Sequence, residues 1–257
     1  PIKSSAASDV YKRQTFINTC FENRKMSYYE HCRYRNFEGV VIVCANFDDP
    51  DVIELMNSEI PVVTIDYVHH NCTAVTSNNI QGMEDLVKYI YSQGHRKIAY
   101  IHGQEGSSVT RDRLASFYRT IDELGLEIPD TYVRTADYLE TKGAAKQTRE
   151  LLNLEDPPTC IIYPDDTSLI GGRNVIIEMG LRIPRDISVA GYDGTMISQL
   201  LYPKLTTIRQ NTEMIGSEAA TRLIGTIEKP RTTLVERVVI EGSLVPGQSV
   251  GAIQPKG

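Results

Sequence analysis

The chain has 257 residues, of which 41% are hydrophobic and 23% charged, as in ordinary soluble globular proteins. Its 27 Lys and Arg against 33 Asp and Glu give a net charge of -6. This argues against tight binding of duplex DNA by the chain itself, because such binding depends largely on cations that replace the counterions of phosphates. The length fits one large or two medium domains, and the longest apolar runs, such as residues 39–45, are far too short to span a membrane.

The first 14 residues differ in character from the rest. They are polar, small and aperiodic, and they run without a turn into an apolar segment. We interpret residues 1–14 as a non-native leader and exclude them from the fold prediction. A disordered natural tail is the alternative.

Short apolar runs bounded by turn residues alternate with amphipathic segments in the first half of the chain. The runs are rich in Val and Ile, as buried parallel strands are, and predict strands at residues 15–20, 39–44, 61–65 and 97–102. Helices are predicted at residues 50–57 and 80–92. In the second helix the apolar residues fall on one face, Asn78 and its neighbours can cap the start, and Gly94 ends it.

The second half repeats this alternation. The pattern predicts strands at residues 132–136, 159–163 and 187–192, and helices at residues 108–124, 143–152 and 167–179. An alternation of strands and helices favours parallel sheets with helices on both faces. Roughly ten strands are many for one open sheet, so we expect two sheets in two lobes joined by crossing strands. Residues 103–106 are interpreted as one such crossover.

Cysteines, histidines and motifs argue against metal chemistry and catalysis. The five cysteines are an odd number and contain no Cys-x-x-Cys pair, so an even disulfide framework is impossible and a zinc site is not expected. This favours a reducing cytosol. The histidines lack metal-ligand spacing, and the sequence has no nucleophile elbow or phosphate-binding loop. Adjacent carboxylates such as Asp48 and Asp49 cannot flank a glycosidic bond. We therefore predict no metal, no cofactor and no enzymatic activity.

Four pairs of stretches, in order, carry a resemblance to a known family. They are IPVVTID and SNNIQG (residues 60–66 and 77–82), GHRKIAYI and RDRLA (94–101 and 111–115), PTCIIYPDD and GLRIPRDISVAGYD (158–166 and 180–193), and LTTIRQ with the predicted helix after it (205–210 and 213–227). Over residues 15–242 the chain resembles the effector-binding core of LacI/GalR-type transcription regulators.

The resemblance implies a periplasmic-binding-protein-like fold, in which two α/β lobes flank a cleft that binds a sugar or related molecule. It also implies a homodimer and a separate helix-turn-helix headpiece for operator DNA. The headpiece and the first strand and helix of the N-terminal lobe are not found in this sequence. We assign residues 15–103 plus 211–233 to the N-terminal lobe and residues 104–210 plus 234–257 to the C-terminal lobe.

Three carboxylates follow predicted strands, at the sheet edge where open parallel sheets bind ligands. Asp66, Asp165 and Asp193 can each accept hydrogen bonds from ligand hydroxyls, and by resemblance they match sugar-contacting positions of the family. As structural alternatives, Asp66 and Asp193 could cap the helices that follow them. Of the adjacent pair Asp165 and Asp166, we expect the first to contact the ligand and the second to cap the next helix.

Arg113 and Gln210 complete the predicted site, also by resemblance. Arg113 lies early in a predicted helix, and its planar guanidinium suits polar recognition. Its alternative is a surface ion pair with Asp112 or Glu105, of little energetic value. Gln210 ends the strand at 205–210, and its amide could instead serve only the backbone.

The predicted site holds three acids and one Arg, so an anionic ligand would meet repulsion. We therefore expect a neutral sugar, or an amino-polyol. The predicted function is effector sensing in the cytoplasm for a DNA-binding transcription regulator, where closure of the lobes around the effector changes the dimer. A transport-type sugar-binding protein of the same fold is the alternative.

Overall fold

The computed structural model describes residues 14–17, 20–21 and 24–253, and the chain forms two compact units. Unit 1 comprises Pro1–Ser77 and Asn211–Ile240, and unit 2 comprises Asn78–Gln210 and Glu241–Gly257. Apart from Gln14, the predicted leader lies outside the described residues.

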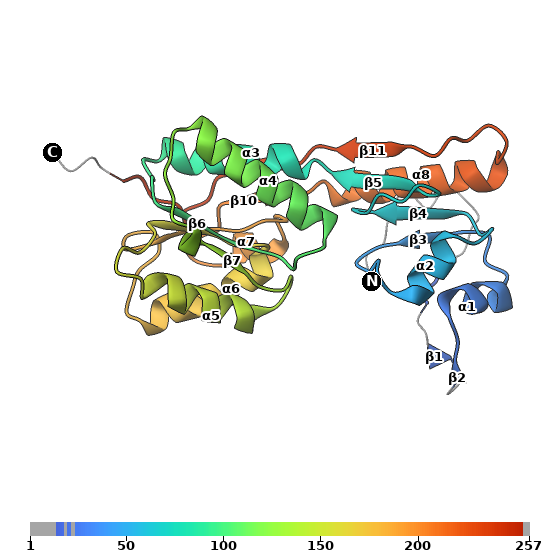
Figure 1. Cartoon of the computed structure of the whole chain (residues 1–257), viewed down its shortest axis with the longest axis horizontal. Helices are drawn as coiled ribbons and strands as arrows, with labels where there is room; N and C mark the ends of the chain where they lie inside the picture. Colours follow the sequence, from blue (N-terminus) through green and yellow to red (C-terminus); the bar gives the residue numbers. More distant parts are fainter. Residues whose placement is uncertain (1–13, 18–19, 22–23, 254–257) are drawn as a thin grey trace. The chain divides into compact units, whose positions relative to one another are not determined.

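Unit 1 contains a parallel sheet with the strand order β11-β5-β4-β3 (Figure 1). Its strands are β3 (Val40–Ile42), β4 (Val62–Ile65), β5 (Thr73–Ser77) and β11 (Arg237–Ile240). Its helices are α1 (Tyr28–Arg35), α2 (Pro50–Met56) and α8 (Thr212–Glu228). A short antiparallel pair, β1 (Cys20–Phe21) and β2 (Arg24–Lys25), precedes α1.

Alternation along β4 explains how helices cover both faces of this sheet. Val62 packs in a cluster with Leu55 of α2, whereas Val63 packs with Ile215 and Ala219 of α8. Successive side chains of a strand point to opposite faces, so one short apolar strand supplies both cores.

Unit 2 contains a second parallel sheet, with the order β7-β6-β8-β9 (Figure 1). Its strands are β6 (Ile98–His102), β7 (Val133–Thr135), β8 (Cys160–Ile162) and β9 (Ser188–Ala190). Its α-helices are α3 (Asn79–Ser92), α4 (Ser108–Glu123), α5 (Thr141–Leu152), α6 (Asp166–Glu178) and α7 (Met196–Leu200), and η2 (Asp130–Tyr132) is a 3-10 turn. An antiparallel pair, β10 (Thr207–Arg209) and β12 (Ser243–Val245), joins this unit, and single bridges connect the β10 segment to β9 and to Asp193.

The same alternation builds unit 2. Ile98 and Tyr100 pack with α3 and α4, whereas Ala99 and Ile101 pack on the opposite face with α5 and α6. Close approach of α5 and α6 depends on Gly171, because a Cβ there would lie 1.9 Å from the carbonyl oxygen of Thr141. Figure 1 shows α5 and α6 side by side below the strands of this unit.

The predicted two-lobed α/β fold with parallel sheets flanked by helices is confirmed. The predicted helices and the strands from residue 39 onward are found within a few residues of their predicted bounds. The strand predicted at residues 15–20 is wrong in its described part, since residues 14–17 have no strand and β1 begins at Cys20. The prediction missed α1, β2, β5, α7, β11 and β12.

The division into units differs from the predicted one. The chain passes between the units at 77/78, 210/211 and 240/241, not at 103/104 or 233/234. Helix α3 belongs to unit 2 because its buried Leu86 and Ile90 share a core cluster with Ile98 of β6. Residues 234–240 belong to unit 1 because β11 pairs with β5. Residues 103–106 are thus a loop inside unit 2, not a crossover.

Candidate ligand-binding site

Arg113 is the centre of a polar cluster in unit 2. It lies in the second turn of α4 and is only 3% exposed. Its Nε donates to Asn79 Oδ1 over 2.8 Å, and its Nη1 donates to the carbonyl oxygen of Pro164 over 2.9 Å. Its Nη2 lies 3.8 Å from Asp193 Oδ1. The predicted alternative, a surface ion pair with Asp112 or Glu105, is therefore wrong.

Aromatic rings surround this guanidinium. It lies 3.5 Å from the ring centre of Tyr192 and 5.9 Å from that of Tyr138. Burial acts to lower the pKa of Arg113, but Tyr192, Tyr138 and Asp193 raise it above its usual value overall, so the group stays charged. The stacked ring fixes the plane of the guanidinium and thereby the directions of its N–H donors.

Asp193 follows β9 and is held by the segment after it. Its backbone has a φ of +94°, in the region that disfavours most side chains. Gln210 donates its side-chain amide to Asp193 Oδ1 and its backbone N–H to the Asp193 carbonyl oxygen. Asp193 does not cap α7, whose N-cap is Thr195. The Asp193 side chain is 27% exposed, so a ligand can reach it.

The adjacent pair Asp165 and Asp166 divides its roles differently from the prediction. Asp165, not Asp166, caps α6 and accepts hydrogen bonds from the backbone N–H and hydroxyl of Ser168. Its Oδ2 also accepts from the backbone N–H of Leu139, which holds the loop before α5. Both carboxylates are buried. Asp165 therefore supports the loop that carries Tyr138.

Asp166 connects three segments. Its carboxylate accepts hydrogen bonds from the backbone N–H and hydroxyl of Thr195 and from the hydroxyl of Thr207. Burial raises its pKa to about 6, although these hydrogen bonds oppose the shift. Sequence reasoning gave this residue a capping role only, and its tie to the loop after Asp193 was missed.

Asp66 lies in unit 1 and has a local role there. It follows β4 with a φ of +58°, and its Oδ1 accepts a hydrogen bond from the backbone N–H of Ser77. It does not cap the next helix, because the N-cap of α3 is Asn78. The predicted contact of Asp66 with a ligand stays a prediction.

The structure thus brings Arg113, Asp193 and Gln210 together, and Asp165 directly follows Pro164, whose carbonyl oxygen accepts from Arg113. Sequence reasoning missed the two tyrosines. Tyr138 shares a 2.9 Å hydrogen bond with the Thr110 hydroxyl, and burial raises its pKa. Tyr192 falls inside the strand predicted at residues 187–192 and Tyr138 in a segment with no predicted element, so no signal in the sequence marked them.

Among the residues that the structure describes, no group of three or more His, Cys, Asp or Glu side chains is placed to hold a metal ion. In the same part of the chain, none of the helices is both long and apolar enough to cross a bilayer.

Comparison with known proteins defines the class. Residues 87–250 match the periplasmic binding protein-like domain family, and the chain belongs to that family. The HTH-type transcriptional repressor ExuR of Bacillus subtilis is 29% identical over 207 residues, which cover 79% of this chain and 62% of the repressor. The chain therefore spans about three fifths of the length of this curated relative.

Solved structures narrow the class further. A LacI transcriptional regulator from Bacillus cereus subsp. cytotoxis is 25% identical with a TM-score of 0.81, and the match covers 88% of this chain and 80% of that one. A complex of the regulator CelR with cellobiose is 26% identical with a TM-score of 0.77, covering 87% and 71%. Within the periplasmic-binding-protein-like class, this chain is an effector-binding core of the LacI/GalR type.

Proposed function

We propose that this chain senses a neutral sugar for a transcription regulator, and that Arg113 and Asp193 make the polar contacts. The buried Arg113, stacked on Tyr192 and facing Asp193, is the observation that carries the proposal. A buried guanidinium with a fixed plane donates to ligand oxygens, while an adjacent carboxylate accepts from ligand hydroxyls. A vicinal diol offers both groups.

Local charge favours a neutral ligand. Asp193 lies 3.8 Å from Arg113 and is partly exposed, so a phosphate or carboxylate near Asp193 would be repelled by it. The similarity to a cellobiose-binding regulator supports a sugar. In this proposal Gln210 and Asp165 do not contact the ligand. Gln210 positions the carboxylate of Asp193, and Asp165 positions the loop that carries Tyr138.

The proposal extends to the whole regulator. The similarity to the repressor ExuR favours transcription regulation in the cytoplasm over transport, and we assign no catalytic activity to the core. Operator DNA is bound, in this proposal, by a headpiece that belongs to the regulator and not to the core. The net charge of -6 agrees with DNA binding by the headpiece, because a negatively charged core is not suited to bind DNA itself.

We also propose that the core forms a homodimer through unit 2. Met196, Leu200 and Tyr202 are 77%, 73% and 82% exposed and lie in or just after α7. Large apolar side chains grouped on a surface are typical of protein interfaces. Replacing Leu200 by Lys should convert a dimer to a monomer in sedimentation velocity, and an unchanged sedimentation coefficient would contradict this interface.

A thermal-shift screen with neutral mono- and disaccharides tests the sugar site. We expect at least one neutral sugar to raise the melting temperature of the wild type. Arg113→Gln and Asp193→Asn should each weaken its affinity on the order of tenfold or more, since each removes a hydrogen bond to a charged group. The exposed Arg111 and Asp122 of the same helix supply matched controls, Arg111→Gln and Asp122→Asn.

Two results would contradict the proposal. One is a sugar phosphate that stabilises the wild type while no neutral sugar does. The other is chemical turnover of a stabilising sugar, which would make the protein an enzyme. Circular dichroism of each variant without sugar establishes that its fold is intact.

A further inference from the structure

A hollow of about 600 Å³ lies in unit 2, between α5 and β7, and none of its lining residues belongs to the proposed sugar site. We name it the α5 hollow. Its lining residues are Arg134, Lys146, Arg149, Glu150, Asn153 and Leu154. Ligand pockets for small molecules span a few hundred to about a thousand Å³. The volume therefore suits a molecule of monosaccharide size.

The charges in the α5 hollow are largely unpaired. Arg149 donates to Glu178 of α6 over 2.8 Å. By contrast, the ion pairs found within the described residues include none of Arg134, Lys146 and Glu150. Two cations and one carboxylate thus line the same hollow without neutralising one another, in a chain whose overall charge is negative.

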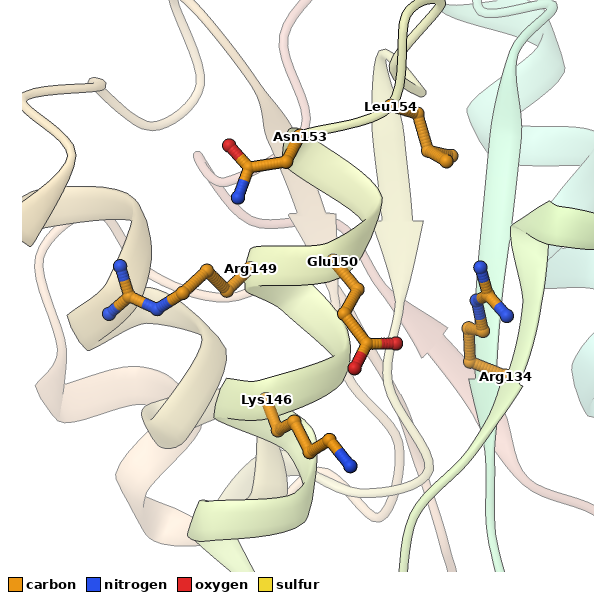
Figure 2. A pocket seen from close by; sticks show the side chains of 6 residues that line it. All are labelled: Arg134, Lys146, Arg149, Glu150, Asn153 and Leu154. Atoms are coloured by element: carbon orange, nitrogen blue, oxygen red, sulfur yellow. The ribbon is translucent and has the colours of Figure 1, made fainter.

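The directions of these side chains are visible in Figure 2. Lys146 and Glu150 project from α5 toward the side on which Arg134 stands, and Arg149 projects the opposite way. Lys146 and Glu150 are four residues apart on α5, so they lie on one face of the helix. Arg134 approaches from β7, an edge strand of the sheet.

Arg134 carries an unpaired donor. Its Nε is buried, and none of the described residues accepts a hydrogen bond from it. A buried donor without an acceptor costs about 1–3 kcal/mol, more for a charged group. The hollow is lined by the Arg134 side chain, and an anionic oxygen bound there would form the strong, charge-assisted hydrogen bonds that guanidinium groups make with phosphate.

We propose that the α5 hollow binds a small phosphorylated polyol, of the size of a monosaccharide phosphate. The phosphate group matches the two positive charges of Arg134 and Lys146, since phosphate esters carry about -1.5 to -2 near neutral pH. The carboxylate of Glu150 accepts hydrogen bonds from the ligand hydroxyls. Leu154 provides an apolar wall for the carbon skeleton.

This site is independent of the proposed sugar site and reverses its selectivity. Asp193 repels anions from the sugar site, whereas Arg134 and Lys146 attract them to the hollow. The core would then respond to a neutral sugar and to a phosphorylated metabolite at two separate places in unit 2.

Titration of the ¹⁵N-labelled chain with glucose 6-phosphate, glucose and inorganic phosphate tests the proposal by NMR. We expect glucose 6-phosphate to cause saturable shifts of amides in residues 146–154 and in β7, weakened by added salt. Inorganic phosphate should cause the same shifts with lower affinity, and glucose should leave these amides unshifted. Glucose shifts around Arg113 would report the sugar site alone.

Variants assign the contacts. Arg134→Gln and Lys146→Gln should each weaken the binding of glucose 6-phosphate on the order of tenfold. Lys142→Gln is the matched control, because Lys142 is exposed on α5 one turn earlier and outside the hollow. Glu150→Gln should strengthen the binding of inorganic phosphate, since it removes a repelling charge.

Three results would overturn the proposal. They are the absence of saturable shifts at the hollow, an equal loss of affinity in Lys142→Gln, and equal binding of glucose at the hollow. Lys146 is exposed, so Lys146→Gln keeps the test valid if Arg134→Gln fails to fold.

Discussion

Replacing Asp166 by Asn should change how the stability of the protein depends on pH. Asp166 is fully buried at the start of α6, and its carboxylate accepts hydrogen bonds from Thr195 and Thr207. Burial raises the pKa of this carboxyl from 3.8 to about 6. At neutral pH the folded protein therefore holds an ionised carboxylate in an unfavourable environment.

The sign follows from the two pKa values. In the unfolded chain Asp166 loses its proton near pH 3.8, and in the folded chain near pH 6. Between these values the folded state binds more protons than the unfolded state, so the free energy of unfolding falls as pH rises. A shift of about two pKa units corresponds to about 3 kcal/mol in total. From about pH 4.5 to about pH 7.5, about 2 kcal/mol of this contribution is lost.

Asn is neutral at all these pH values, so Asp166→Asn removes the pH-dependent contribution of this side chain to the free energy of unfolding. It retains one oxygen to accept from Thr207, but its NH2 group faces the backbone N–H of Thr195. The variant should therefore be less stable than the wild type near pH 4.5, by about 1–3 kcal/mol for the donor left without an acceptor. The difference should shrink by about 2 kcal/mol near pH 7.5.

Urea denaturation of wild type and Asp166→Asn at several pH values measures this difference. Subtracting the two curves removes the contributions of all other titrating groups. Asp122→Asn, an exposed change on α4, should show a difference that is nearly constant with pH. A constant difference for Asp166→Asn, or one that widens as pH rises, would refute the reasoning.

Three further predictions concern packing and reactivity. Gly171→Ala gains about 1 kcal/mol in helix propensity but forces a Cβ against the Thr141 carbonyl, so unfolding should show a net loss of about 2 kcal/mol. Gly82→Ala places a Cβ 2.2 Å from the Tyr192 hydroxyl and should displace the ring that stacks on Arg113. The apparent affinity for the sugar, measured by thermal shift, should fall at least tenfold, while circular dichroism should show an unchanged fold. In a Cys20→Ser background, a thiol reagent should label the exposed Cys44 fast and the remaining buried cysteines only on unfolding, as mass spectrometry can follow.

The helices and strands predicted best are those whose buried positions are occupied by hydrophobic residues. Helix α3 has a clear apolar face and a capping Asn78, and both were visible in the sequence. Strand β5 was missed because all five of its residues are buried but three are Thr or Ser. Pairing with β4 and β11 satisfies its backbone, and this depends on strands distant in sequence. The unit boundary at Ser77 was misplaced because this strand was not predicted.

Some residues of the candidate site could likewise be predicted from the sequence and others could not. Parallel strands end at one edge of a sheet, so the sequence could place Asp165, Asp193 and Gln210 near one another. It could not predict the rings around Arg113, because Tyr138 and Tyr192 come from loops whose conformation depends on tertiary contacts. The hydrophobic residues of these loops show no periodicity from which the loop conformation could be predicted.

Adjacent carboxylates are the clearest case of this limit. Asp165 and Asp166 have the same chemistry, and either could cap α6. The choice depends on Leu139, whose φ of +59° turns its N–H toward Asp165, and on Thr195, whose N–H is aimed at Asp166. Each donor belongs to a loop that follows a different strand. The roles of these carboxylates are therefore decided by backbone conformations outside the motif, whereas Asp193, held by Gln210 and facing Arg113, has a side chain that is 27% exposed.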